Sequence, residues 1–222
     1  MNSILSKRPN ILIIQECENL EKIKFDDRNN QPSDLLWIWD NPNKWIWIFT
    51  FGNYKLSILD EYNHSIKYII PISVVSESNH FILFAIWANN REDKDNQYIE
   101  QVWNAILYYE HILSDENIIL IWDFNSNKIW DKKHRIWNHS DVVDKLLAKN
   151  IHSIYHTLHS QKHWEEFHPT FFLQRNLNKP YHIDYCFVSW NYYSKVSDFT
   201  IWNYDEWIWI SDHMPLQIDF NL

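Results

Sequence analysis

Short apolar runs that end in polar residues recur along the chain. They occupy residues 11–14, 45–51, 68–75, 81–87 and 118–122, and strand-like runs return from 183 onward, the last at 216–220. Polar stretches rich in turn-forming residues, such as 76–79, separate them. Continuous apolar runs of this length are typical of buried strands, and the pattern therefore predicts a strand-rich protein.

Two segments show helical spacing instead. Between 96 and 113 apolar residues recur every three or four positions, which predicts the best-defined helix of the chain. A shorter helix is expected to begin at Ser140 and Asp141, whose side chains can cap it, and to continue through Leu147. Because the chain has no internal repeat, linker-like stretch or low-complexity tail, we expect one mixed α/β domain over 1–222.

Composition narrows the class of protein. No run of 18 apolar residues is present, so no membrane span is expected, and the four apolar residues that follow Lys7 and Arg8 are too few for a signal peptide. Cys17 and Cys186 both lie in strand-like runs, which favours buried thiols over a disulfide. We therefore expect a cytoplasmic location and a monomer.

The formal net charge is −9, which argues against a protein that coats nucleic acid through a basic face. It does not exclude a nuclease, because a metal site concentrates carboxylates and the bound cation reverses their local sign. The main basic segment, 132–135, is more typical of a solvated loop, although it could touch a nucleic-acid backbone.

Polar residues follow several of the strand-like runs and are the candidates for chemistry. They form four short segments: Gln15-Glu16, Asp123-Phe124-Asn125, His182-Ile183-Asp184-Tyr185 and Ser211-Asp212-His213. Carboxylates suit Mg²⁺, a histidine can exchange a proton near neutral pH, and a facing carboxylate fixes its tautomer. Each segment alone is typical of a solvated turn, so the argument depends on their combination.

Together and in this order, the segments resemble the endonuclease/exonuclease/phosphatase superfamily. Its members carry Gln-Glu, Gly-Asp-Phe-Asn, Ile-Asp-Tyr and Ser-Asp-His in the same order along the chain. Pro169-Thr170-Phe171 is similar to a further Pro-Thr segment of the family. The resemblance runs from about Pro9 to the C-terminus. It implies a four-layer α/β sandwich, in which two packed mixed β-sheets are flanked by helices.

The resemblance also implies roles for single residues. Glu16 would be the principal metal ligand, with Asp212 beside the metal. Asp123 and Asn125 would position the nucleophilic water and the phosphate. Asp184 would orient His213, the general base or phosphate-activating group. The implied cofactor is Mg²⁺, with Mn²⁺ as a substitute.

One further position is open. Many superfamily nucleases contact phosphate through a His or Tyr on a central strand, whereas the comparable strand here offers Trp87, which we interpret as core. His182, next to the Ile-Asp pair, could bind phosphate, and Tyr155 and His156 could lie near the pocket. The remaining histidines do not match a compact zinc pattern: His152, His159, His163 and His168.

The start of the chain departs from the family. Family members begin with a strand that carries a site asparagine about one helix ahead of the Gln-Glu strand. Here only 15 residues precede Glu16, so the first strand is missing from this sequence. Either the start was assigned too late, or the sheet lacks this edge and a central strand edge is exposed.

The balance of glycine and tryptophan is the second departure. The chain has one glycine, Gly52, and 14 tryptophans. Trp122 stands where the family has glycine before Asp123, and seven other tryptophans occupy places that suit glycine: Trp39, Trp45, Trp47, Trp137, Trp164, Trp202 and Trp209. One hypothesis is a gene in which UGA encodes glycine but was translated as tryptophan. The alternative is a genuinely tryptophan-rich chain.

The function expected from these patterns is magnesium-dependent hydrolysis of a phosphodiester, with DNA as the first substrate to consider. The acidic composition leaves a small-molecule or lipid phosphoesterase open. A catalytically impaired binding module of the same fold is the alternative from another class, favoured by Trp122 and the missing strand.

Overall fold

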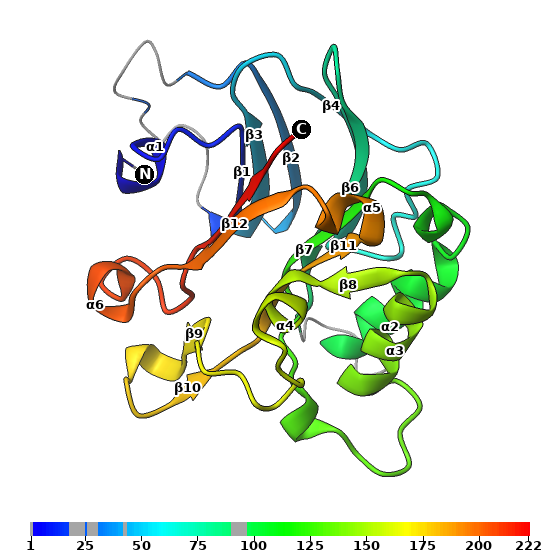
Figure 1. The fold of residues 1–222 in the computed structure, drawn as a ribbon, viewed down its shortest axis with the longest axis vertical. Coiled ribbons are helices and arrows are strands. Elements are labelled where there is room, and N and C mark those ends of the chain that lie inside the picture. Colours follow the sequence, from blue (N-terminus) through cyan, green and yellow to red (C-terminus); the bar gives the residue numbers. More distant parts are fainter. Residues whose placement is uncertain (1, 18–24, 26–30, 42–43, 90–96) are drawn as a thin grey trace.

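The structure is a computed structural model that describes residues 2–17, 25, 31–41, 44–89 and 97–222 (Figure 1). Six strands form the larger sheet, in the spatial order β4-β5-β6-β7-β11-β8. Strands β6 and β7 are parallel and the other neighbours are antiparallel, so this sheet is mixed. Its strands are β4 Lys55–Ile58, β5 Ile69–Val75, β6 His80–Trp87, β7 Ile118–Asp123, β8 Ile151–Ser153 and β11 Asp184–Ser189.

The facing layer contains two smaller antiparallel sheets. One has the order β1-β3-β2 and the other pairs β12 with β13. Side chains of β1, β3, β12 and β13 pack against the larger sheet around a core that includes Ile48, Ile72 and Val188. The strands of this layer are β1 Ile11–Cys17, β2 Asp34–Asn41, β3 Lys44–Thr50, β12 Val196–Ile201 and β13 Leu216–Phe220.

Helices cover the outer faces of both layers. Helices α2 (Ile99–Tyr108) and α3 (His139–Ala148) pack on the larger sheet, and the short α1 (Asn2–Leu5) packs through Leu5 on the outer face of β1 and β3. Figure 1 shows α2 and α3 on the side of the larger sheet that faces away from β1, β2 and β3. The predicted four-layer sandwich is therefore confirmed.

The remaining elements are short and connect these layers. A two-stranded sheet of β9 (Phe171–Phe172) and β10 (Pro180–Tyr181) lies between β8 and β11 in the sequence. The short helices are α4 Ile154–His159, α5 Trp190–Tyr193 and α6 Tyr204–Trp207, and 3-10 turns occupy Ile112–Ser114, Lys128–Trp130 and Leu173–Arg175. No described helix is long and apolar enough to cross a membrane.

Two helix boundaries differ from the prediction. The second helix begins at His139 and not at Ser140, because Asn138 is its N-cap and the Asn138 N–H donates to Asp141 Oδ2 at 2.7 Å. Ser140 instead donates its hydroxyl to Asp131 at 2.5 Å. The helix expected over 96–113 is shorter, Ile99–Tyr108, and a 3-10 turn follows at Ile112.

Burial agrees with the interpretation of two core residues. Cys186 is a buried free thiol, whereas the side chain of Cys17 lies outside the described residues. Trp87 is 2% exposed and its ring lies 5.2 Å, centroid to centroid, from that of Tyr68. Trp87 is therefore a core residue, as expected.

Candidate active site

Asp123 and Asp184 meet where β7 ends and β11 begins. They are direct partners in the antiparallel ladder, so the end of one strand places its carboxylate beside the start of the next. Both side chains are buried, at 2% and 3% exposed. Burial and the neighbouring charge of Asp184 raise the pKa of Asp123 well above its usual range. This pair of buried carboxylates is the centre of the site.

His213 completes the centre from the C-terminal part of the chain. Its Nδ1 donates to the Asp184 carboxylate, with Nδ1–Oδ1 and Nδ1–Oδ2 distances of 3.0 and 3.1 Å. Burial works against the charged imidazole, but the negative charge of Asp184 outweighs it and raises the pKa of His213 to about 10. The contact with Asp184 therefore favours the protonated form of the His213 ring.

The turn after β7 aims Asn125 back at Asp123. The Asn125 backbone N–H donates to Asp123 Oδ1 at 2.7 Å, and its side-chain amide donates to Oδ2 at 3.2 Å. Asn125 has φ 47, a left-handed conformation that asparagine tolerates better than most residues. Phe124 points into the core and is fully buried, which anchors the turn.

Thr170 ties three distant segments together at this point. Its hydroxyl is buried and accepts hydrogen bonds from the backbone N–H groups of Ile183 and Asp184, each at 3.0 Å. Its carbonyl accepts from the Met214 N–H at 2.6 Å. An isolated bridge between Phe171 and His213 continues the pairing. The Pro-Thr segment thus holds Asp184 and His213 in register.

Glu16 and Asp212 lie around the centre. Glu16 is exposed, near the end of β1, and its charge further raises the pKa of Asp123 after the larger effects of burial and Asp184. The charge of Asp212 adds to that of Asp184 in raising the pKa of His213. The Gln15 side chain donates to the Ile86 carbonyl and so joins the end of β1 to β6. These contacts gather the predicted segments at one end of the sandwich.

The donor set of the centre fits a divalent cation. Donor atoms of Asp123, Asp184 and His213 lie within 4.8 Å of one another, whereas Glu16 and Asp212 stand outside this tight group. Burial and, after it, the charge of Asp184 raise the pKa of Asp123, and a proton or a cation between the two carboxylates would relieve both effects. Oxygen donors of this kind suit Mg²⁺.

His182 is close to the centre but buried. Its side chain is 5% exposed, and Nδ1 donates to the His168 carbonyl at 2.7 Å. Burial lowers the pKa of His182 to about 4, so the ring is neutral. The Tyr155 ring covers it at a centroid distance of 4.6 Å. Contact between His182 and phosphate therefore stays a prediction.

Two of the eight tryptophans in glycine-like places have a glycine-like backbone. Trp122 has φ 122 and Trp164 has φ 93, values that side chains with a Cβ rarely adopt. Trp47, by contrast, is buried in β3 and stacks on Phe49. The side chains of Trp39 and Trp45 lie outside the described residues. Backbone conformation thus supports glycine at two positions.

The fold matches solved structures at low sequence identity. The endonuclease domain of TRAS1, a telomere-specific non-LTR retrotransposon, is 14% identical with a TM-score of 0.65, covering 100% of this chain and 90% of that chain. A 3′ phosphatase, NExo from Neisseria, solved with a product DNA hairpin, is 15% identical with a TM-score of 0.68, covering 100% and 93%. An AP endonuclease from Archaeoglobus fulgidus is 14% identical with a TM-score of 0.67, covering 100% and 92%.

No family model matches the sequence, and no curated protein matches it. The structural matches show that the fold of this chain is that of the endonuclease/exonuclease/phosphatase proteins. Fold alone does not transfer an activity, which has to be argued from the site.

Proposed function

We propose that this chain, which has the endonuclease/exonuclease/phosphatase fold, is a metal-dependent phosphodiesterase acting on DNA. The observation that carries the proposal is the buried Asp123–Asp184 pair with His213 hydrogen-bonded to Asp184. Two adjacent buried carboxylates cost stability in a fold that does not use them. Their cost is explained if they serve to bind a cation and to move protons.

The chemistry of the donors favours Mg²⁺, with Mn²⁺ as a substitute. Asp123 and Asp184 would supply inner oxygen donors, and Glu16 and Asp212 would approach from the rim of the site. When bound, a divalent cation supplies positive charge that keeps the carboxylates ionised and stabilises the charge that develops on the phosphate.

The side chains divide the remaining work. Asn125 binds a phosphate oxygen and, with Asp123, places the water in line with the scissile P–O bond. Water attacks phosphorus as this bond breaks, its proton passes to the Asp123 carboxylate, and the departing alkoxide takes up a proton from solvent.

His213 acts as a charged donor in this scheme. Because Nδ1 is held by Asp184, Nε2 is the nitrogen left to face the substrate, and the carboxylates around the ring favour its protonated form. An imidazolium stabilises negative charge on a phosphate oxygen. Of the two roles expected for His213, phosphate activation is therefore favoured over that of a general base.

DNA is the proposed substrate because the matching structures include DNA-acting proteins. TRAS1 contributes an endonuclease domain, and the NExo structure contains a DNA product. In this chain, residues 132–137 line an open surface hollow of about 440 Å³ with Lys132, Lys133 and Arg135 on its walls. Such a basic surface could contact a nucleic-acid backbone. A small phosphodiester remains the competing substrate class.

Trp122 favours the second candidate, an impaired binding module. A bulky residue at φ 122 immediately before Asp123 would strain the strand end that carries the centre. Such a module would keep the fold and lose hydrolysis.

The test is Mg²⁺-dependent hydrolysis of supercoiled plasmid and of a chromogenic phosphodiester, side by side. We expect His213→Ala to lose activity by at least about 100-fold, the scale on which a preorganised charge donor acts. His80→Ala is the matched control, because His80 is exposed and lies at the opposite end of β6, about 23 Å along the strand. The better substrate assigns the class.

Three results would contradict the proposal. Equal activity in the His213 variant would mean that the reaction occurs at another site. Activity that survives a chelator would mean that the reaction does not require a cation. No hydrolysis by the folded chain, either as written or with glycine at position 122, would favour the binding module.

A further inference from the structure

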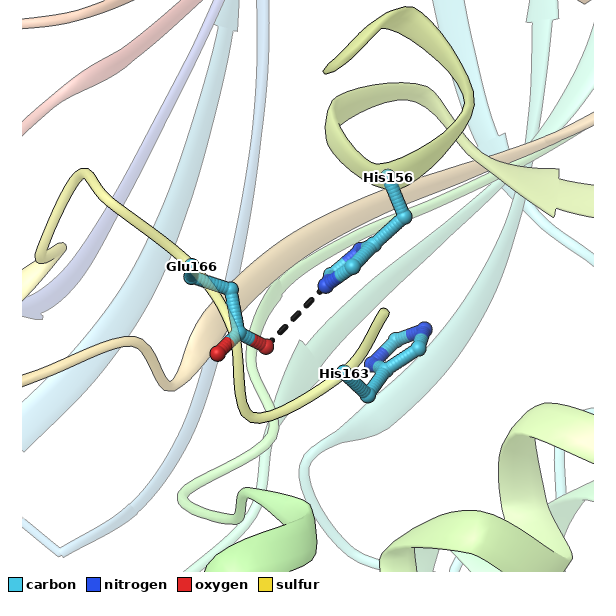
Figure 2. A group of neighbouring side chains, drawn as sticks. All are labelled: His156, His163 and Glu166. Carbon is cyan, nitrogen blue, oxygen red and sulfur yellow. Dashed lines mark hydrogen bonds and ion pairs between the residues drawn. The ribbon is translucent and has the colours of Figure 1, made fainter. Parts of the chain in front are cut away.

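A second group of potential metal donors lies outside the catalytic centre. His156 belongs to α4, and His163 and Glu166 follow in the segment after it; one donor atom from each lies within 4.8 Å of the other two (Figure 2). His156 Nε2 and Glu166 Oε1 are 3.0 Å apart, and their side chains are 7% and 5% exposed. The group shares no residue with Asp123, Asp184 and His213.

Surrounding polar groups hold two of these side chains in place. The Ser153 hydroxyl is 2.7 Å from His156 Nδ1, which leaves Nε2 facing Glu166. Glu166 accepts hydrogen bonds from the Asn127 amide at 3.2 Å and from the Trp164 N–H at 2.9 Å. Ligands of metal sites are characteristically oriented by such outer partners, which fix the histidine tautomer.

Two further imidazoles next to the group each have one buried nitrogen without a hydrogen-bond partner. His139 is fully buried; its Nε2 is 2.9 Å from His163 Nδ1, but its Nδ1 has no hydrogen-bond partner. His182 Nε2 is also without a hydrogen-bond partner, and its ring centroid is 5.8 Å from that of His156. Buried nitrogens without a partner carry a cost, so the hydrogen bonding of the histidines around this group is incomplete.

We propose that His156, His163 and Glu166 bind a zinc-class transition-metal ion. Two imidazoles and one carboxylate are a donor set of borderline softness that suits Zn²⁺ and disfavours Mg²⁺, which prefers oxygen. The histidine spacing did not predict this set, because only His163 of the four remaining histidines takes part, and it joins His156 and Glu166 across the end of a helix.

Binding requires one ring to move. The His156 and His163 rings stack with centroids 3.6 Å apart and planes at 13°. A single ion cannot lie in both nearly parallel ring planes, where the nitrogen lone pairs point. The partly exposed His163 therefore has to turn, which releases the His139 Nε2 that it now contacts, and solvent would supply the fourth donor.

The consequence is structural. The ion would join α4 to the segment that leads to Thr170, which holds the backbone of Asp184. This role does not depend on the proposed phosphodiesterase activity.

The experiment measures zinc retention by the full chain after chelation, reloading with Zn²⁺ and removal of free metal. It uses an Asp184→Asn background, so that the catalytic centre does not compete. We expect one zinc ion per chain, lost in Asp184→Asn/His163→Gln and kept in Asp184→Asn/His80→Gln. At a free Zn²⁺ concentration 100 times the dissociation constant, the thermal midpoint should rise by about 5–10 °C.

Circular dichroism checks that each variant is folded. Because His163→Gln could disturb the segment itself, Co²⁺ loading of the Asp184→Asn chain provides a second measurement, and intense visible absorption of a four-coordinate site is the expected result. The proposal is overturned if the folded background chain retains no zinc and gives no such absorption, or if the folded His163→Gln variant retains a full equivalent.

Discussion

Replacing Trp122 by alanine and by glycine separates backbone strain from side-chain packing. Both changes remove the indole, which packs partly against the core between the sheets. They differ in the Cβ atom alone. At an ordinary strand position glycine is less stable than alanine by about 0.5–1 kcal/mol because of its greater freedom in the unfolded chain. At φ 122 the Cβ itself costs about 1–3 kcal/mol, and glycine does not bear this cost.

The order of stability should therefore be reversed at this position. We expect the free energy of unfolding of Trp122→Gly to exceed that of Trp122→Ala by roughly 0.5–2 kcal/mol, which is the strain energy of the Cβ minus the entropic cost of glycine. Trp37 is the matched control, because it is an exposed tryptophan within β2. There, Trp37→Gly should be less stable than Trp37→Ala.

The assay is urea unfolding with a common slope for all four variants, so that midpoints report free energy of unfolding. The informative quantity is the difference between the two sites, about 1–3 kcal/mol, because the loss of each ring cancels within its own pair. If glycine is the less stable substitution at Trp122 by the same margin as at Trp37, the strain argument is refuted.

Three other changes test separate contacts. Thr170→Val should destabilise by about 2 kcal/mol or more, since it leaves the Ile183 and Asp184 N–H groups without an acceptor, while Thr170→Ser should not; equal urea midpoints would contradict this. In the presence of a chelator, the His213–Asp184 contact should contribute its full stabilisation below pH 6.5 and lose it as the pH rises toward about 10, because folding raises the pKa of His213. His213→Gln should flatten this dependence of stability on pH, and an unchanged dependence would count against the contact. Trp164→Gly should be more stable than Trp164→Ala by thermal unfolding, as expected at φ 93, and the opposite order would argue against glycine there.

Much of the site could be predicted because the sheet does most of the positioning. The apolar run of β7 ends at Asp123 and that of β11 begins at Asp184, so both carboxylates lie at one edge once the strands pair. The sequence shows such strand ends directly, as apolar residues followed by polar ones. Their pairing with His213 followed from the resemblance, since 28 residues separate it from Asp184.

Other features depend on tertiary contacts that no local pattern specifies. The helix after residue 137 offers Asn138, Ser140 and Asp141 as caps, and the bond between Asn138 and Asp141 selects the earliest. The grouping of His156 with Glu166 arises because α4 ends and the chain turns back, which histidine spacing does not reveal. Three-residue β8 is too short to give a periodic signal.

Three residues in the segments of the candidate centre have positive φ angles, and their values distinguish a tolerated conformation from a mismatch between sequence and backbone. Glu16 and Asn125 have φ 50 and 47, within the small left-handed region that side chains can occupy. Strain of this kind is expected where a site is held in place. Trp122, at φ 122, lies outside that region, in a conformation that only glycine adopts without strain.

The mismatch at Trp122 thus agrees with the hypothesis that a UGA codon for glycine was translated as tryptophan. A functional need for a large side chain would not explain this conformation, because any side chain with a Cβ is strained at φ 122. Sequencing of the gene decides between the two explanations. UGA codons at both Trp122 and Trp164 are expected, and a UGG codon at Trp122 would leave a strained tryptophan beside Asp123 as a real property of the protein.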